Sequence, residues 1–544
     1  MATKLDRKSL PSGTQAGDFV YVGRPASDQG DFGSEVGIAD MACVNQFGEA
    51  NNSKYYHAGV VRHTPTGRFY VYLEWGRIKG GNSWSGSFQG GDYQFVEASS
   101  EADARAFFSK QCNEKNLKRL VKTDIGGKMI WTAKQGDDGY LVQRLATRTR
   151  GLPDAYNIKD SSGVVTVVAS TPVTKPTINT KTYQPQVVDL AKALVGGTRT
   201  YARAASSATG IVPTMAAIEE VRNECIPNAL SLIASIGSDE NAQLGDSRLQ
   251  ALSRYVATIV PRPIPRGGGA MSILLNTNNI LAIQQDLDAF ESALKGEDFS
   301  TTKVTETVDP DSMLNANLRW LDPRSDGAWI RDQFLSMDSK RHSNFRNARI
   351  LNIFEVSRPD RDQAFLQTVQ RLAEARKGQN LGDIPVGMQP ASRPDVADIA
   401  PWVKDANVFL GIHGTRGVNV APILGSHFRL PKSLSGVQIT GAAFGHGVYF
   451  ATVTGKSANY CGNKASAYGS GGNIAGRGYF MFLCDVAGGK FHYPTSAWGI
   501  SDKCPGGGDS VYAHPRKVSS LQHDEHVIFD PTASRIRYVV ELDW

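Results

Sequence analysis

The stretch that most constrains this chain runs from residue 445 to residue 461. Residues 445–451 read Gly-His-Gly-Val-Tyr-Phe-Ala, so two glycines allow a sharp turn before a short apolar run that is typical of a buried strand. Residues 456–461 read Lys-Ser-Ala-Asn-Tyr-Cys and carry a hydroxyl and a ring three residues apart, on one face of a helix. Tyr449, Ser457 and Tyr460 could form a slot for a flat aromatic amide, with the hydroxyl bound to its carbonyl. The same spacing also fits a tyrosine-rich core, so both interpretations stay open here.

Two further blocks flank this stretch, and the three together are specific. Residues 409–416 read Phe-Leu-Gly-Ile-His-Gly-Thr-Arg, and residues 523–530 read His-Asp-Glu-His-Val-Ile-Phe-Asp. In this order the blocks resemble the catalytic domain of the poly(ADP-ribose) polymerases. The resemblance identifies His413, Tyr449 and Glu525 with the His-Tyr-Glu triad of that family.

The resemblance implies that NAD is the ADP-ribose donor and that no metal takes part. Cleavage of the nicotinamide–ribose bond passes through an oxocarbenium-like state, as in glycoside hydrolysis. Glu525 would stabilise the positive charge on the ribose and orient the acceptor. In the family, a glutamate at this position implies elongation of a polymer. The residues implied in binding the donor are His413, Gly414, Thr415, Arg429, Tyr449, Ser457 and Tyr460.

A second resemblance lies near the N-terminus. Residues 54–61 and 68–77 predict two strands, the second of which ends in Trp75-Gly76-Arg77, and residues 99–117 predict a helix that begins at a serine cap. A sheet followed by a helix, with this triplet, resembles a WGR domain. The resemblance implies that Trp75, Gly76 and Arg77 bind DNA ends, the Trp by stacking and the Arg on phosphate. The alternative is that Trp75 is a core residue.

The middle of the chain has helical periodicity. We expect a helix over residues 187–195 that stops at Gly196-Gly197, and a helix over 214–236 that Pro227 interrupts or kinks. The segment 252–261, Leu-Ser-Arg-Tyr-Val-Ala-Thr-Ile-Val-Pro, resembles the regulatory helical domain of the same family. That resemblance implies a bundle that blocks the NAD site until DNA is bound.

Length and composition set the remaining expectations. A chain of 544 residues is too long for one core. We expect a disordered arm (1–17), a β-sheet-plus-helix WGR domain (18–130), a linker (131–182), an all-helical regulatory domain (183–305) and an ADP-ribosyltransferase domain (306–544). The fold class is therefore multidomain α+β, and two packed sheets are expected in the last domain. The six scattered cysteines argue against a zinc finger.

The cellular setting follows less directly. Without an apolar run long enough for a membrane span or a signal peptide, we expect an intracellular protein with no membrane partner. The location would be the nucleus in a eukaryote, and the cytoplasm if the origin is prokaryotic or viral. The net charge of +6 permits nucleic-acid contact without requiring it.

Three functions remain open from the sequence. The leading hypothesis is a poly(ADP-ribosyl)transferase that DNA strand breaks activate and that modifies itself and other proteins in a DNA-damage response. The second is a mono-ADP-ribosyltransferase or NAD hydrolase at the same site. The third is a DNA-end-binding scaffold whose transferase fold is catalytically silent.

Overall fold

The computed structural model divides into two compact units. It describes residues 3–5, 10–15, 17–44, 54–77, 92–134, 139–143, 182–209, 211–237, 239–261, 270–295, 309–336, 348–383, 397–430, 443–461, 473–497, 499–500 and 502–544. The first unit comprises Met1–Val173, Ala202–Ile280 and Glu297–Thr301, and the second comprises Thr174–Tyr201, Leu281–Gly296 and Thr302–Trp544. The helical segment expected to form one domain over 183–305 is thus shared between the two units.

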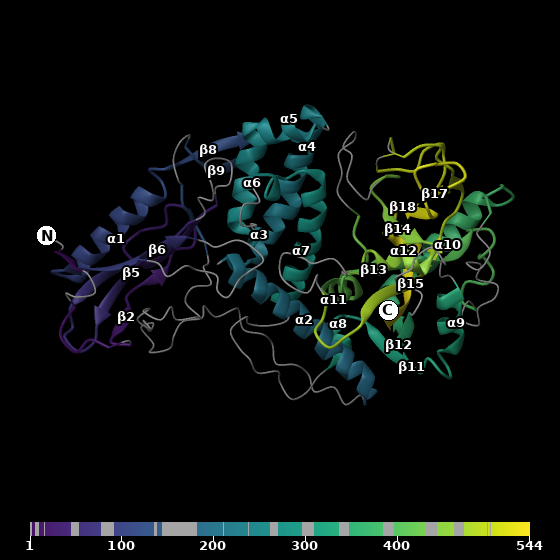
Figure 1. Ribbon diagram of the computed structural model, residues 1–544, viewed down its shortest axis with the longest axis horizontal. Helices are drawn as coiled ribbons and strands as arrows, with labels where there is room; N and C mark the ends of the chain where they lie inside the picture. The colour runs from purple at the N-terminus through teal and green to yellow at the C-terminus, as the bar shows by residue number, and fades with distance from the viewer. Residues whose placement is uncertain are drawn as a thin grey trace. The chain divides into compact units, whose positions relative to one another are not determined.

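The first unit contains an eight-stranded sheet with the strand order β1-β7-β6-β5-β4-β10, in which β2 pairs with β5 and β3 with β4 (Figure 1). The strands are β1 (Thr3–Leu5), β2 (Phe19–Tyr21), β3 (Arg24–Pro25), β4 (Val36–Cys43), β5 (Lys54–His63), β6 (Phe69–Arg77), β7 (Asp92–Ala98) and β10 (Leu141–Val142). Strand β1 pairs antiparallel with β7, so residues 3–5 of the expected disordered arm form a strand. Strand β10 pairs with β4, so the sheet extends past the boundary predicted at residue 130. The remainder of the predicted linker, 144–181, lies outside the described residues.

Helix α1 (Glu101–Lys115) covers one face of this sheet. The Ser100 side chain accepts a hydrogen bond from the Asp103 backbone N–H, which confirms the predicted serine cap. The helix buries Ala104, Phe108 and Cys112 in a core that the sheet shares. After α1, β8 (Leu120–Ile125) and β9 (Lys128–Ala133) form an antiparallel hairpin.

Helices follow the first sheet in the sequence, and a proline interrupts one of them. The first unit holds α3 (Met215–Glu220), a π-helical segment (Val221–Cys225), α4 (Ile226–Ile236), α5 (Glu240–Gly245), α6 (Ser247–Ile259) and a 3₁₀ turn (Ala270–Ser272). Pro227 lies in the first turn of α4, directly after the π-helical segment, because proline has no N–H for a regular helical bond. The interruption predicted at Pro227 is therefore confirmed.

Two long helices contribute residues to both units. They are α2 (Pro185–Thr209) and α7 (Thr277–Lys295). The stop predicted at Gly196-Gly197 is wrong, because α2 continues through both glycines. A Cβ at Gly197 would lie 2.8 Å from Ile474 Cγ1, so the glycine allows close packing that outweighs its low helix propensity.

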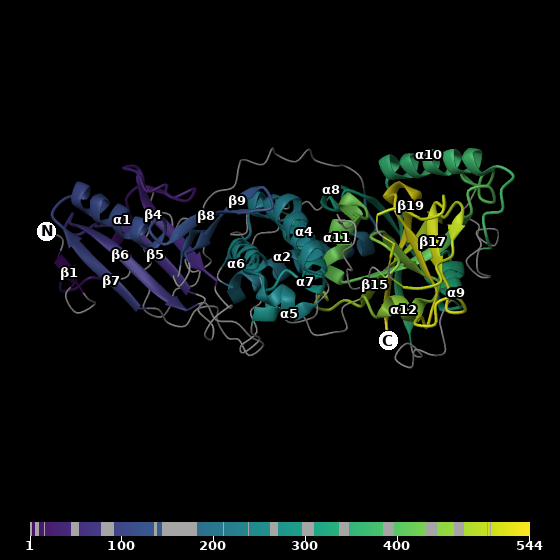
Figure 2. The ribbon, with the colours of Figure 1, turned by 90° about the horizontal axis from the view of Figure 1, so that it is seen from above.

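The second unit contains a nine-stranded sheet with the strand order β11-β12-β19-β15-β13-β14-β18-β17-β16 (Figure 2). The strands are β11 (Asn317–Leu321), β12 (Arg349–Ser357), β13 (Val408–Thr415), β14 (Val448–Ala451), β15 (Tyr479–Ala487), β16 (Phe491–His492), β17 (Ser510–Ala513), β18 (Glu525–Ile528) and β19 (Ser534–Asp543). One hydrogen-bonded path joins all nine, which corrects the expectation of two packed sheets. The two parts meet at β13 and β14, which share the single register pair Ile412–Ala451.

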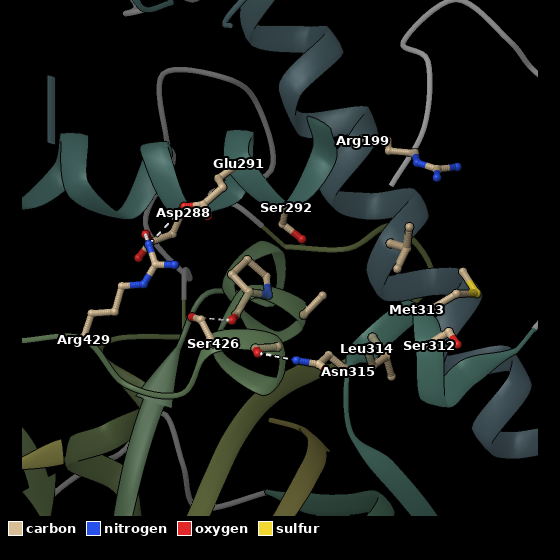
Figure 3. Close-up of a pocket in the computed structure, with 14 residues that line it drawn as sticks. Arg199, Asp288, Glu291, Ser292, Ser312, Met313, Leu314, Asn315, Ser426 and Arg429 are labelled. Atoms are coloured by element: carbon tan, nitrogen blue, oxygen red, sulfur yellow. Dashed lines mark hydrogen bonds and ion pairs between the residues drawn. The ribbon is translucent and has the colours of Figure 1, made fainter. Parts of the chain in front are cut away.

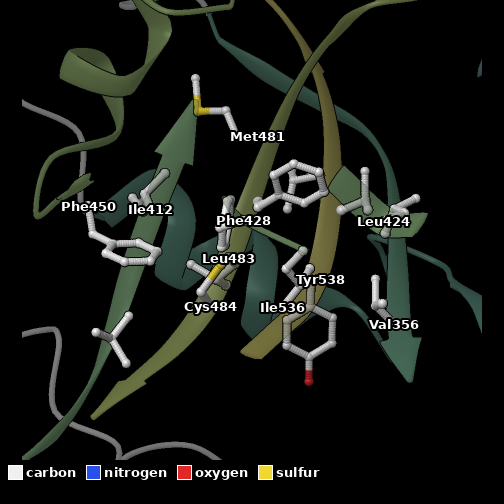
Figure 4. Packing of buried hydrophobic residues seen from close by; sticks show 14 of the residues in the cluster. Val356, Ile412, Leu424, Phe428, Phe450, Met481, Leu483, Cys484, Ile536 and Tyr538 are labelled. Atoms are coloured by element: carbon white, nitrogen blue, oxygen red, sulfur yellow. The ribbon is translucent and has the colours of Figure 1, made fainter. Parts of the chain in front are cut away.

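Helices and a 3₁₀ turn surround this second sheet. They are α8 (Pro310–Leu314), α9 (Ala328–Ser336), α10 (Pro359–Arg376), α11 (Gly417–Ser426), α12 (Thr454–Ala458) and the 3₁₀ turn Pro531–Ala533. Buried side chains from β12, β13, β15 and β19 meet those of α11 in one apolar core, which Figure 4 shows from close by. This core holds the strands that carry the candidate site.

Candidate active site

Three neighbouring strands carry the predicted triad. His413 lies near the end of β13, Tyr449 lies in β14, and Glu525 begins β18. In the register of these strands, Ala451 pairs with Ile412 on one side and with Glu525 on the other. The residues are 36 and 76 positions apart in the sequence (449 − 413 and 525 − 449), and strand pairing brings them to one region of the sheet.

The histidine is held in one protonation state. Its Nδ1 lies 2.9 Å from the backbone oxygen of Tyr449, and because a carbonyl only accepts, Nδ1 carries the proton. Burial lowers the pKa of His413, and the Tyr449 carbonyl opposes this effect in part. The ring is therefore neutral at pH 7, and Nε2 has the lone pair that can accept a hydrogen bond from a ligand hydroxyl.

Gly414 and Ser457 bring β13 and α12 into backbone contact. A Cβ at Gly414 would lie 2.0 Å from the Ser457 backbone oxygen, so no side chain fits there. The Ser457 side chain is buried, and its hydroxyl donates to the backbone oxygen of Ile412 over 3.3 Å. Thr415, the next residue of β13, is buried as well. The predicted carboxamide-binding residues thus meet at one point of the fold.

The two tyrosines of the predicted slot differ in how they are held. The Tyr449 hydroxyl donates to the Gly445 backbone oxygen over 2.7 Å and accepts from the Phe444 N–H over 3.0 Å. Burial raises the pKa of Tyr449, so its hydroxyl stays protonated. Tyr460, which follows α12, is 56% exposed. One ring is thus fixed by the turn before β14, and the other is open to solvent.

Lys456 lies at the candidate site, and the sequence analysis did not single it out. Its ammonium forms an ion pair with the Glu525 carboxylate. The side chains are only 14% and 15% exposed, so this charge pair is largely shielded from water. The same ammonium lies 3.5 Å from the Asp524 backbone oxygen, and the Tyr512 hydroxyl donates to the Asp524 carboxylate over 2.6 Å. Its position beside Ser457 was the signal that could have pointed to it.

Arg429, a predicted donor-binding residue, contacts α7 in this structure. Its Nη1 lies 3.0 Å from a carboxylate oxygen of Asp288 and 3.0 Å from one of Glu291 (Figure 3). Beside this cluster is a half-open pocket with a cavity volume of about 290 Å³, lined by α2, α7, α8 and α11. The Asp288 and Glu291 carboxylates thus form ion pairs with the guanidinium that was predicted to bind NAD.

A second arginine contacts the same helix. Arg416, the last residue of the His-Gly-Thr-Arg block, lies 3.0 Å from the Asp286 carboxylate and 3.4 Å from the Tyr201 hydroxyl. The Tyr201 hydroxyl also donates to Asp286 over 2.7 Å. Both charged side chains are 15% exposed, so this contact is more deeply buried than the one at Arg429.

The predicted DNA-binding triplet lies at the end of β6. Trp75 is half-buried and packs against the core that the sheet shares with α1, which agrees with a partly structural role. Gly76 pairs with Tyr55 across the sheet, and the Arg77 side chain lies outside the described residues. Among the described residues, no cluster of His, Cys, Asp or Glu has the geometry to hold a metal ion. No described helix is long and apolar enough to cross a membrane.

Comparison with known proteins adds independent information. Residues 326–544 match the family model of the poly(ADP-ribose) polymerase catalytic domain. Poly(ADP-ribose) polymerase 2 of Caenorhabditis elegans is 31% identical over 155 residues, which cover 24% of this chain and 26% of that protein. Poly(ADP-ribose) polymerase 2-A of rice is 30% identical over 159 residues, 24% of this chain and 22% of that protein.

A longer match extends into the middle of the chain. Poly(ADP-ribose) polymerase 1 of Xenopus laevis is 23% identical over 349 residues, which cover 58% of this chain and 30% of that protein. The chain therefore spans between about a fifth and a third of the length of the curated relatives it matches.

Proposed function

We propose that this chain transfers ADP-ribose from NAD to proteins, including itself. The reason is that residues 326–544 match the family model of the poly(ADP-ribose) polymerase catalytic domain. The observation that carries the proposal is the arrangement of His413, Tyr449 and Glu525 on three neighbouring strands. The complete set favours an active enzyme over a silent scaffold.

The donor would be held at both ends. Backbone groups of Gly414 and the hydroxyl of Ser457 suit a carboxamide, and the Tyr449 ring suits the face of the nicotinamide. The neutral His413 offers an acceptor nitrogen to a ribose hydroxyl on the adenosine side. Binding energy from these remote contacts supports distortion at the reacting carbon, where the glycosidic bond breaks.

Glu525 would act at the reacting centre. Its carboxylate can stabilise the positive charge that develops on the ribose as nicotinamide leaves. It can also deprotonate an incoming acceptor hydroxyl or orient an incoming acceptor carboxylate. Lys456 would hold this carboxylate in one position, as the shielded ion pair between them supports. Elongation of a polymer is the outcome we propose, with mono-transfer as the alternative that product length decides.

We further propose that α7 restrains the site until a DNA break is bound through Trp75, Gly76 and Arg77. The ion pairs of Asp288 and Glu291 with Arg429 support this proposal, because they occupy a guanidinium expected to bind the donor. In a eukaryotic cell such an enzyme would work in the nucleus, in the response to DNA damage.

The double variant Asp288→Ala/Glu291→Ala tests this restraint. Two partly exposed ion pairs are worth roughly 1–2 kcal/mol together, which corresponds to a five- to thirtyfold shift in population. Incubation with labelled NAD, with and without a nicked duplex, should therefore show higher label incorporation without DNA and a smaller stimulation by DNA. A ladder or smear on a denaturing gel would indicate polymer, and a single band would indicate mono-transfer.

A matched control is available on α2. Asp189→Ala removes an acidic side chain that pairs with Arg477 and does not contact Arg429. This control should keep the DNA dependence of the unmodified chain. Unchanged DNA dependence in the double variant would contradict the proposed restraint without bearing on the transferase activity itself.

A further inference from the structure

A basic surface lies at one end of the first sheet, and the predicted Trp75-Gly76-Arg77 triplet is not part of it. Residues 110–134 contain seven Lys or Arg and two Asp or Glu, a net charge of +5, whereas the whole chain carries +6. This segment comprises the end of α1 and the β8–β9 hairpin, which lie next to each other in Figure 1. The other residues of the chain therefore sum to a net charge of only +1.

The fold holds like charges together at this place. The Lys134 ammonium donates to the Lys118 backbone oxygen over 2.8 Å, and the Lys134 N–H donates to the Arg119 backbone oxygen over 3.1 Å. The Lys118 side chain is 66% exposed, and the carboxylate near its ammonium is that of Glu114, at 3.6 Å. The Glu114 carboxylate, itself 38% exposed, offsets little of the Lys118 charge. A like-charged cluster of this kind is an electrostatic footprint for a polyanion.

Aromatic rings accompany the lysines. The Lys122 ammonium lies 5.2 Å from the centroid of the Trp131 ring, which faces it across the hairpin. The Lys115 ammonium lies 5.3 Å from the Tyr56 ring. These contacts orient long side chains that would otherwise sample many rotamers, so less entropy is lost when a phosphate binds.

One member of the basic surface, Lys115, lies beside the strand pair that carries the predicted DNA-end site. Tyr56, under the Lys115 ammonium, is the register partner of Trp75 in the neighbouring strand. Strand β5 begins, and β6 and α1 end, at this end of the sheet. A duplex whose terminal nucleotide stacks on Trp75 would place its next phosphates within reach of lysine side chains nearby.

We propose that Lys115, Lys118, Arg119, Lys122 and Lys134, here called the basic corner, bind the phosphate backbone of duplex DNA beside the end that Trp75 engages. This inference rests on the proposed DNA-end binding and deepens it. The basic corner would supply affinity without sequence preference, because phosphate contacts position a protein and carry no base information. It would also make the affinity dependent on salt, through release of counterions.

The test measures binding of a fluorescent nicked duplex by anisotropy at several salt concentrations. Each phosphate contact contributes about 0.9 to the slope of log K against log salt concentration. The variant Lys118→Ala/Lys134→Ala should therefore lower the magnitude of this slope by about 2. It should also weaken binding several-fold at low salt, and near-normal label incorporation at saturating DNA should remain.

The control removes two positive charges at the opposite end of the sheet. Arg62 lies near the end of β5, and Arg68 lies beside the start of β6, where it pairs with Glu97. The variant Arg62→Ala/Arg68→Ala should leave the slope within about 0.5 of the original value, since only general charge is lost. An equal change in both double variants would overturn the proposal, because it would indicate a non-specific field effect.

A third variant separates this inference from the proposed function. If the unmodified chain binds the duplex and Trp75→Ala weakens it, DNA-end binding stands. An unchanged slope in Lys118→Ala/Lys134→Ala would then overturn the basic corner alone. If the unmodified chain shows no binding to the duplex, the proposed DNA-end binding itself fails, and the basic corner fails with it.

Discussion

His526, directly after Glu525, makes the stability of the catalytic sheet depend on pH. Its ring is fully buried, stacks on Tyr512 with centroids 4.0 Å apart, and lies 4.3 Å from the Phe409 ring. Both ring nitrogens are buried without a hydrogen-bond partner among the described residues. Burial lowers the pKa of His526 to about 3, so the folded protein keeps this ring neutral.

The sign of the effect follows from proton linkage. In the unfolded chain a histidine binds a proton near pH 6.5, whereas folded His526 does so only near pH 3. Between these values the unfolded state holds more protons, so the free energy of unfolding falls as the pH falls. At pH 5 the loss is about 2 kcal/mol for this one residue. His427, whose pKa burial lowers to about 4, adds a loss of similar size.

His526→Phe should remove the part of this acid sensitivity that His526 contributes. The replacement keeps an aromatic ring between Tyr512 and Phe409 and removes the two ring nitrogens that lack hydrogen-bond partners among the described residues. We therefore also expect a gain of about 1 kcal/mol in the free energy of unfolding at pH 7. Unfolding in urea at pH 7 and pH 5, read by amide exchange of peptides from β15 and β18, reports on this sheet. Between the two pH values the variant should lose about 2 kcal/mol less than the unmodified chain.

Val527→Ala is the matched control for this experiment. It truncates the next buried residue of the same strand without changing any titrating group. Stability should fall by about 1–2 kcal/mol at both pH values, with the pH dependence unchanged. If His526→Phe keeps the full acid sensitivity of the unmodified chain, the reasoning from burial to linkage is refuted.

Two further substitutions test the site. Gly414→Ala places a Cβ 2.0 Å from the Ser457 backbone oxygen and must push β13 and α12 apart. We therefore expect a tenfold or greater rise in KM for NAD and a loss of about 2 kcal/mol in stability by thermal melting. An unaltered KM and melting temperature would contradict this close-packing argument. Lys456→Met removes the ion-pair partner of Glu525, so kcat should fall about 10- to 100-fold while KM changes little. Steady-state kinetics with a labelled donor measures both constants. An unchanged kcat would show that the ion pair is only structural.

Local signals predicted the elements well. The serine cap of α1 and the proline in the first turn of α4 each depend on a residue and its immediate neighbours, and both predictions were confirmed. The stop expected at Gly196-Gly197 failed because α2 packs closely on Ile474, which is distant in the sequence. Propensity alone carries no information about such a contact.

For the candidate site too, the sequence indicated the residues but not all of their contacts. The three sequence blocks indicated His413, Tyr449 and Glu525, and strand pairing then placed them together. The contact of Lys456 with Glu525 joins residues 69 positions apart (525 − 456) and depends on the register of β14 and β18. The ion pairs of Arg429 depend on where α7 lies, so neither contact could be derived from spacing.

The central claim is that Glu525 carries the chemistry of ADP-ribose transfer from NAD. Its most direct test compares Glu525→Gln with the unmodified chain in the presence of a nicked duplex and labelled NAD, measuring both label incorporation and nicotinamide release. We expect a loss of at least about 100-fold in incorporation, with NAD affinity within about threefold, because the carboxylate acts mainly in the transition state. Incorporation at the original rate in Glu525→Gln would show that this carboxylate does not carry the chemistry.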